Sequence, residues 1–261
     1  MPLLVLTDAT KTFGDRVALD GISLTIPPGE LVAVIGRSGA GKTTLLRCVA
    51  GAMALSGGRI VVGGEDVAAL RGRRRRGHRA RIGMIYQQFN LVKRLRVLDN
   101  VRIGRLPHLA GWRRWAALVR YFDAAETAMA LRCLGHVGLA RHVWQRTDTL
   151  SGGEQQRVAI AKVLAQEPAL ILADEPVASL DVANSALVME TLRRVVDTSR
   201  LSVLATLHHV DCARRYADRV LALVHGRLVF NGSPEVLNDS LLELIFGRTG
   251  PLPLADLREA R

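Results

Sequence analysis

The chain has 261 residues, of which 49% are hydrophobic and 23% charged, a length and composition that allow a sizeable core and exclude an intrinsically disordered chain. Its 36 Lys and Arg against 24 Asp and Glu give a formal net charge of +12, which favours an anionic partner such as a nucleotide, a nucleic acid or a membrane face. The longest hydrophobic run has five residues, against the roughly 18–20 needed to cross a bilayer, and residues 1–6 lack the features of a secretion signal, so we expect a cytosolic protein.

The first strands are predicted from short hydrophobic runs bounded by Gly and Pro. Residues 22–26 alternate in polarity, residues 27–29 form a turn, and residues 31–35 are hydrophobic on both faces, so we expect a hairpin that ends in a central buried strand. A second hairpin is expected around Gly63 and Gly64. These strands predict an N-terminal antiparallel β-subdomain.

A helical insertion is predicted from about residue 89 to residue 163, where the strand pattern gives way to helical spacing. Leu131, Leu134 and Val137 show this spacing. We interpret the segment as an α-helical subdomain inserted between two parts of one sheet.

Strand patterns return after the insertion, and they complete an α/β fold with a mainly parallel sheet core. The runs lie at residues 169–173, 201–205 and 220–224; Val188, Leu192 and Val195 predict a crossover helix between the first two, and His225-Gly226 predicts a hairpin turn after the third. We expect one domain over residues 1–247 and an extended tail over 248–261.

A phosphate-binding loop is predicted at residues 36–43, which match GxxxxGK[ST] directly after the run 31–35 and before a helical pattern. Glycines let backbone N–H groups converge on phosphate oxygens, and the helix N-terminus adds its positive dipole end. Lys42 would reach the β- and γ-phosphates of a nucleotide, and Thr43 would offer a hydroxyl to Mg²⁺. A simple glycine-rich turn is the alternative, but it needs neither the lysine nor the hydroxyl. The residues expected to bind the nucleotide here are Gly36, Arg37, Ser38, Gly39, Ala40, Gly41, Lys42, Thr43 and Thr44.

Two acidic residues follow the hydrophobic run 169–173. A phosphate-binding loop needs such an acidic partner for the metal ion, at the carboxyl end of a strand. Asp174 is placed to hold Mg²⁺ through water, and Glu175 can polarise the water that attacks the γ-phosphate. The alternative is an acidic helix N-cap after a strand, which leaves the upstream loop without a metal partner.

The segment 150–157, Leu-Ser-Gly-Gly-Glu-Gln-Gln-Arg, resembles the signature of ATP-binding-cassette (ABC) proteins. Ser151, Gly152, Gly153 and Glu154 open a helical pattern, so their amides would form a second anion site. An N-capped helix is the plain alternative; two glycines at its start are costly for a helix, and close phosphate approach explains them better. The resemblance implies that this motif binds ATP held by the other subunit of a homodimer.

Further segments resemble ABC motifs in the expected order along the chain. Gln87 resembles the glutamine that touches the metal and senses the membrane partner, and Asp181 lies in a segment that resembles the loop crossing the dimer interface. His208 matches the histidine that contacts the γ-phosphate; its neighbour His209 is the alternative, separated from it only by spacing. Phe13 matches the aromatic residue that stacks on adenine, with a core phenylalanine as the alternative.

The resemblance covers about residues 3–246 and narrows to the ATP-binding subunits of phosphonate importers, on segments 35–42, 81–92, 172–181 and 207–211. It implies an ATPase and translocase subunit, peripheral at the cytoplasmic face of the inner membrane, with membrane permease subunits and a periplasmic substrate-binding protein as partners. Phosphonate is the expected solute, with phosphite or phosphate as alternatives. Glu154 departs from the family, because glutamine is usual there, and its carboxylate is expected near the partner's nucleotide.

Two rival functions remain to be weighed. An ABC ATPase acting on nucleic acid or ribosomes would use the basic run 71–81, which holds seven arginines, but the run lacks interleaved aromatic residues, so we interpret it as a solvated helical face and expect no nucleic-acid partner. A P-loop kinase would leave Ser151 to Glu154 without a task.

The three cysteines, Cys48, Cys133 and Cys212, fit no disulfide framework or metal knuckle and are expected to be ordinary half-buried thiols.

The surface that contacts the permease is predicted in the helical insertion, beside Gln87. The aromatic and hydrophobic residues offered for it, with a place in the core as the alternative, are Trp112, Trp115, Leu118, Tyr121 and Phe122.

Overall fold

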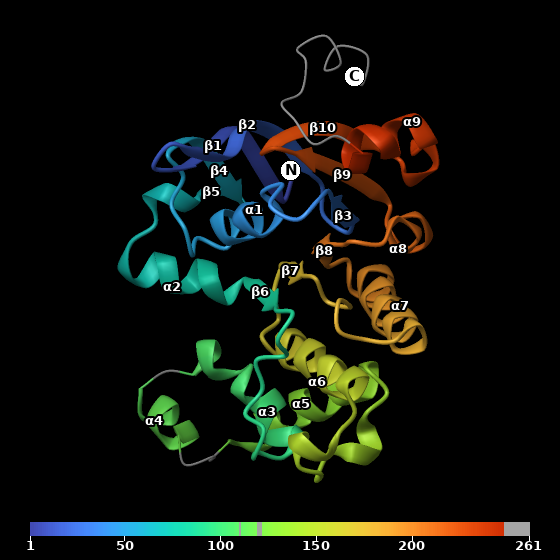
Figure 1. The fold of residues 1–261 in the computed structure, drawn as a ribbon. Helices are drawn as coiled ribbons and strands as arrows, with labels where there is room; N and C mark the ends of the chain where they lie inside the picture. The colour runs from blue at the N-terminus through green and yellow to red at the C-terminus, as the bar shows by residue number, and fades with distance from the viewer. Residues whose placement is uncertain (110, 119–121, 248–261) are drawn as a thin grey trace.

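The computed structural model describes residues 1–109, 111–118 and 122–247, and Figure 1 shows their arrangement. The tail predicted over residues 248–261 lies outside them. The strands among these described residues form two sheets. The first is antiparallel, in the order β2-β1-β4-β5, and the second has the order β10-β9-β3-β8-β7-β6, parallel except for β10. The strands are β1 Leu4–Phe13, β2 Arg16–Ile26, β3 Leu31–Ile35, β4 Gly57–Val62, β5 Glu65–Asp66, β6 Ile82–Ile85, β7 Leu170–Asp174, β8 Ser202–Thr206, β9 Arg219–Val224 and β10 Arg227–Gly232.

The predicted hairpin between residues 22–26 and 31–35 is wrong, because β2 and β3 belong to different sheets. The burial of the two strands gives the reason. The last residues of β2 alternate between buried and exposed, whereas all five residues of β3 are buried. A strand whose two faces are both buried needs a neighbouring strand on each side and a layer of structure packed on each face. A two-stranded hairpin cannot supply these, so β3 is a central strand of the second, parallel sheet.

The other strand predictions are confirmed. Val62 pairs with Glu65 across the turn at Gly63 and Gly64, and Val224 pairs with Arg227 across the predicted turn at His225-Gly226. The crossover helix is α7 Val182–Ser199, and its Val188, Leu192 and Val195 are buried, as their spacing predicted.

Two hydrophobic cores lie on opposite faces of the parallel sheet. On one face, α1 Lys42–Val49 is packed between the two sheets, and its Leu45 and Leu46 belong to the same core as Leu6 of β1 and Val34 of β3. The other core joins the opposite sheet face to α7, to α8 Val210–Tyr216 and to the helical insertion. The alternation of side chains along β3 explains the division, because successive residues point to opposite faces.

The helical insertion occupies the lower half of Figure 1. Its α-helices and 3-10 helices (η) are α3 Val97–Ile103, η2 Leu106–His108, α4 Trp112–Leu118, α5 Ala124–His136, η3 Ala140–His142, η4 Thr147–Thr149 and α6 Gly152–Ala165. Of the residues that predicted α5, Leu134 and Val137 are buried, but Leu131 is exposed.

The remaining helices flank the two sheets. They are η1 Val67–Ala69 and α2 Gly72–Ala80 between β5 and β6, and η5 Pro234–Val236, α9 Asp239–Leu242 and a π-helical turn Glu243–Gly247 after β10. Among the residues that the structure describes, no helix has both the length and the hydrophobicity to span a membrane.

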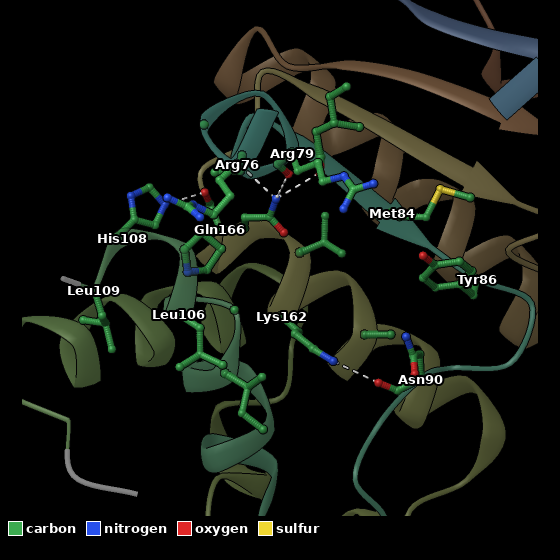
Figure 2. Close-up of a pocket in the computed structure, with 18 of the residues that line it drawn as sticks. Arg76, Arg79, Met84, Tyr86, Asn90, Leu106, His108, Leu109, Lys162 and Gln166 are labelled. Carbon is green, nitrogen blue, oxygen red and sulfur yellow. Dashed lines mark hydrogen bonds between the residues drawn. The ribbon is translucent and has the colours of Figure 1, made fainter. Parts of the chain in front are cut away.

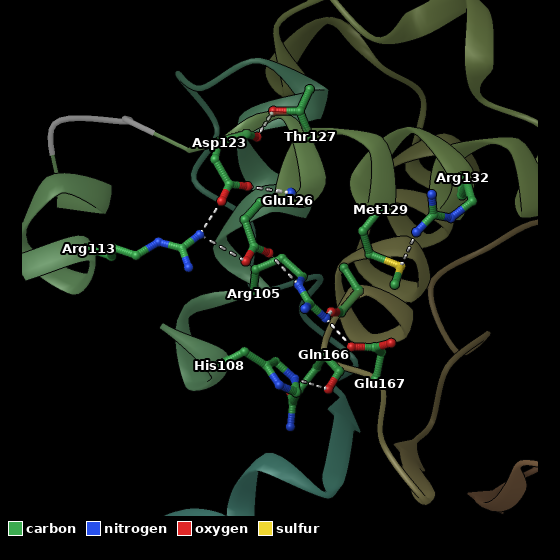
Figure 3. A network of polar contacts seen from close by, with 11 residues as sticks. Arg105, His108, Arg113, Asp123, Glu126, Thr127, Met129, Arg132, Gln166 and Glu167 are labelled. Carbon is green, nitrogen blue, oxygen red and sulfur yellow. Dashed lines mark hydrogen bonds and ion pairs between the residues drawn. The ribbon is translucent and has the colours of Figure 1, made fainter. Parts of the chain in front are cut away.

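A polar network centred on the mostly buried Arg105 and Glu126 holds the insertion together, and Figure 3 shows its contacts. Arg105 donates to Glu126 at 2.6 Å and to the carbonyl of Ala165 at 2.8 Å, and it also pairs with Glu167. The three contacts join the segment before η2 to the start of α5 and the end of α6. Arg113 of α4 reaches the other oxygen of Glu126 at 3.5 Å, which links α4 to the same group.

Candidate functional site

The order of the parallel strands brings the predicted catalytic segments to one edge of the sheet. β6, β7, β8 and β3 are consecutive neighbours, and the carboxyl ends of parallel strands share an edge. The phosphate-binding loop follows β3, Asp174 ends β7, His208 lies two residues beyond β8, and Gln87 lies two residues beyond β6. Segments up to about 170 residues apart therefore meet at one place.

Two of the three predicted metal ligands, Thr43 and Asp174, are hydrogen-bonded to each other. Thr43 donates its hydroxyl to Asp174 Oδ1 at 3.0 Å, and Thr206 donates to the same oxygen at 3.1 Å. The Thr206 hydroxyl also accepts from the backbone N–H of Glu175 at 2.8 Å. Sequence reasoning missed Thr206; a polar residue at the end of the hydrophobic strand β8 was the available signal.

Lys42 is folded back into the loop that it closes. Its Nζ donates to the carbonyls of Gly36 at 2.7 Å and Arg37 at 3.1 Å, and the side chain is buried. Burial lowers the pKa of Lys42 from its ordinary value, and the nearby carboxylates of Glu175 and Asp174 oppose this shift. An ammonium enclosed among carbonyls and near two carboxylates is a suitable partner for a phosphate group.

Two glycines of the loop are required by its backbone. Gly36 and Gly41 have φ values of 145° and 104°, and a Cβ on either would lie 2.3 Å from the carbonyl oxygen of Leu223 or 2.4 Å from that of Ala18. Any other residue would force the loop away from the two strands that support it.

Glu175 and His208 contact each other through Oε1 and Nε2. Glu175 has a positive φ of 52°, a conformation that costs energy in a residue with a side chain and is concentrated at functional sites. The contact places His208, rather than His209, beside the predicted catalytic carboxylate. His209 is instead exposed at the N-cap of α8.

Phe13 and Gln87 are both accessible to a ligand. Phe13 ends β1 with 47% of its surface exposed, so the core alternative is wrong, and Lys11 Nζ lies 5.0 Å from its ring centroid. Arg16, which sequence reasoning missed, lies beside Gly39 of the loop, since its guanidinium would be 3.5 Å from a Cβ there. The turn between β1 and β2 is thus adjacent to the phosphate-binding loop. Gln87 is exposed.

The predicted second anion site lies at the start of α6. Ser151 is its N-cap and forms a capping box with Glu154. A Cβ on Gly153 would lie 2.2 Å from Oδ1 of Asn184, so packing against α7 by itself requires a glycine there. Asp181 caps α7 and accepts from the backbone N–H of Asn184 at 2.8 Å, a hydrogen bond that lowers its pKa. In Figure 1, α1 lies in the upper half of the molecule and α6 in the lower half.

A groove of about 1260 Å³ opens between the helical insertion and α2 (Figure 2). Arg73, Arg76 and Arg79 of α2 line one side, while Leu106 and Trp115 belong to the other. Tyr86, which precedes Gln87 in the sequence, also lines the groove.

The predicted permease-contact residues differ in burial. Trp112 and Trp115 are 67% and 73% exposed, so the core alternative is wrong for both. Phe122 is partly buried, with the Arg102 guanidinium 5.8 Å from its ring centroid. The side chain of Leu118 and all of Tyr121 lie outside the described residues.

A phosphate-binding loop, a strand-end aspartate and glutamate, and a histidine after the next strand define a nucleotide-hydrolysing site on a parallel sheet. The chain belongs to the ABC transporter family, whose model matches residues 19–178. The fold class predicted from the sequence, a P-loop NTPase of the ABC type, is therefore confirmed.

Two curated relatives extend the match to most of the chain. The phosphonates import ATP-binding protein of Rhodopseudomonas palustris (strain BisB5) is 48% identical over 244 residues, which cover 94% of this chain and 89% of the relative. The protein of the same name from Frankia casuarinae is 46% identical, covering 93% of this chain and 95% of the relative. The predicted resemblance to this group is confirmed.

Solved structures agree with the fold. A dimeric ATP-binding cassette in a post-hydrolysis state, bound to ADP and phosphate, is 29% identical with a TM-score of 0.74, covering 88% of this chain and 98% of that one. A component of an ABC transporter complex from Clostridium perfringens is 26% identical with a TM-score of 0.78, covering 90% and 89%.

Proposed function

We propose that this chain is the ATP-hydrolysing subunit of an ABC importer for phosphonate, working as a homodimer attached to a membrane permease. The observation that carries the proposal is the convergence of Lys42, Thr43, Asp174, Glu175 and His208 at one sheet edge. The two curated relatives support the solute class, because both are named phosphonates import ATP-binding proteins.

ATP would be bound by the loop at the edge of β3. The amides of the loop and the N-terminus of α1 would face the phosphates, with Lys42 supplying a positive charge. Phe13 would stack on the adenine. Its exposed ring lies at the turn beside the loop, and an aromatic face binds a base without needing a specific hydrogen bond.

Mg²⁺ fits the hydroxyl of Thr43 and the carboxylate of Asp174, because both are oxygen ligands and lie 3.0 Å apart. Gln87 would add a third ligand. In the described part of the chain, no group of three or more His, Cys, Asp or Glu could hold a metal alone. That suits an ion that takes few protein ligands and shares the phosphates, where it neutralises charge.

Glu175 would accept a proton from the attacking water, and His208 would hold the carboxylate toward it. His208 would also reach the terminal phosphate. Both residues contribute by position, because phosphoryl transfer depends mainly on alignment and charge neutralisation.

A homodimer would complete the site. In Figure 1, α6, of which Ser151 is the N-cap, lies in the lower half, and α1, which follows the loop, lies in the upper half, so the amides of α6 would meet the ATP of the other subunit. The solved dimeric cassette with 29% identity supports this arrangement. ATP binding would then close the dimer and shift the attached permease between its two states.

The permease would dock in the groove between α2 and the insertion. The exposed Trp115 offers an apolar anchor, and the arginines of α2 offer positive charge at the cytoplasmic face of the inner membrane. A periplasmic substrate-binding protein would act through the permease. Because the solute never meets this subunit in such an assembly, phosphite and phosphate are the alternative solutes.

Two substitutions test the hydrolytic function. Glu175→Gln is expected to retain ATP-dependent dimerisation and to lose hydrolysis by at least about a hundredfold, within the usual contribution of a general base. Lys42→Ala is expected to lose nucleotide binding. Phosphate release and sedimentation of the purified protein measure the two steps, and normal turnover by Glu175→Gln would contradict the proposal.

The solute is tested in proteoliposomes that contain the cognate permease. Phosphonate-loaded binding protein is expected to stimulate ATP hydrolysis, and the same binding protein loaded with phosphate or phosphite serves as the comparison. Stimulation by phosphate alone would transfer the assignment to that solute.

A further inference from the structure

Glu154 occupies the hydrogen-bonding groups of Ser151 that the proposed dimer needs. Its Oε2 accepts both the backbone N–H and the hydroxyl of Ser151, each at 2.9 Å, while Ser151 Oγ accepts from the backbone N–H of Glu154 at 3.3 Å. A serine hydroxyl has one proton to donate. While Glu154 holds it, Ser151 cannot donate to any other acceptor.

The surroundings keep this carboxylate in place. Its other oxygen, Oε1, lies 3.4 Å from Nε2 of His142, and Arg157 on the next turn of α6 adds positive charge. The hydrogen bond from the Ser151 backbone N–H and these charges lower the pKa of Glu154. The group is therefore a carboxylate at neutral pH, bound to donors that also suit a phosphate.

We propose that Glu154 is a positioning residue that competes with the terminal phosphate of the partner's ATP for Ser151, and so raises the ATP concentration at which the dimer closes. The inference rests on the proposed function, in which Ser151 faces that phosphate. A carboxylate and a phosphate are both anionic oxygen acceptors, so they compete for the same N–H and O–H donors. Closure of the dimer must break the hydrogen bonds from Ser151 to Glu154. It also brings the negatively charged terminal phosphate of ATP near the Glu154 carboxylate.

A glutamine at this position would weaken the competition in two ways. Its amide oxygen is neutral, and hydrogen bonds to a charged acceptor are roughly twice as strong as those to a neutral one. It also removes the repulsion between the carboxylate and the approaching phosphate. We expect Glu154→Gln to lower the ATP concentration for half-maximal dimerisation about fivefold, which corresponds to about 1 kcal/mol for each site.

The experiment uses the full chain with Glu175→Gln as the background, so that ATP is not consumed. Dimerisation is followed by sedimentation over a range of ATP concentrations with Mg²⁺. Glu154→Gln and Glu154→Ala are both expected to shift the midpoint to lower ATP, since glutamine is a weaker acceptor for Ser151 and alanine removes the acceptor altogether. Asp148→Asn is the matched control. It also removes one negative charge, but from η4, the short helix before α6, where Asp148 pairs with Arg146, and it should leave the midpoint unchanged.

A second readout separates this role from a purely structural one. In the chain with Glu175 intact, Glu154→Gln is expected to lower KM for ATP about fivefold while kcat stays within about twofold, because the change affects closure rather than chemistry. A loss of the capping box alone would lower the melting temperature without lowering KM.

The possible results distinguish a failure of the inference about Glu154 from a failure of the proposed function. If the Glu175→Gln chain dimerises with ATP but neither change at Glu154 lowers the midpoint, the inference is overturned and the proposed function stands. A higher midpoint would overturn it equally, because the carboxylate would then favour closure. If the Glu175→Gln chain never dimerises with ATP, both are overturned.

Discussion

Replacing Arg105 by leucine should destabilise the helical insertion, because Arg105 is the centre of its polar network and is paired with the mostly buried Glu126. The Arg105 and Glu126 side chains are only 12% and 10% exposed, and the substitution would leave the Glu126 carboxylate without its 2.6 Å partner. Removing one member of a buried ion pair costs about 3–5 kcal/mol. Arg113 still faces Glu126 at 3.5 Å, so we expect the lower end, about 3 kcal/mol.

The loss can be measured by chemical unfolding followed through tryptophan fluorescence. The three tryptophans, Trp112, Trp115 and Trp144, all lie within the insertion, so the signal reports on the part that the network holds. At roughly 3 °C for each kcal/mol in a chain of this size, the melting temperature should fall by about 9 °C.

Two further variants decide whether the charge network is the cause. Leucine at both Arg105 and Glu126 should recover most of the loss, because no buried charge remains unpaired. Arg59→Leu, which breaks the more exposed pair with Asp66, should cost no more than about 1 kcal/mol. A loss below about 1 kcal/mol for Arg105→Leu, or no recovery in the double variant, would refute the reasoning.

Three other outcomes are expected. Phe13→Ala should weaken ATP binding about tenfold, from the loss of one stacked base, and leave the binding of tripolyphosphate unchanged in calorimetry. Trp115→Glu should abolish co-purification with the permease, while the ATPase activity of the isolated chain is retained; an intact complex would contradict docking in the groove. Burial raises the pKa of Cys48 and Cys133 to about 11, so at pH 8 only about one thiol in a thousand is ionised and alkylation by iodoacetamide should be slow. Mass spectrometry should show the rate increase as the pH rises toward 11, and rapid labelling of the native chain at pH 8 would refute this.

The strands, helices and phosphate-binding loop were predictable where their determinants are close in the sequence. The loop at residues 36–43 carries its glycines, lysine and hydroxyl on one continuous segment, and α7 shows its buried face in the spacing of Val188 and Leu192. The partner of β3 was not predictable in this way. A hydrophobic run indicates burial on both faces, but it does not specify which other strand lies beside it.

The sequence by itself determined the residue types of the predicted site, namely the glycines, lysine and hydroxyl of the loop at residues 36–43 and the carboxylates of Asp174 and Glu175, together with the order of the motifs along the chain. The tertiary structure alone decided the contact of Glu175 with His208, the shared hydrogen bonds of Thr206 and the network around Arg105. The physical reason is distance along the chain. Local motifs depend on the conformation of a few consecutive residues, whereas these contacts form only after long loops between strands, or between helices of the insertion, have closed.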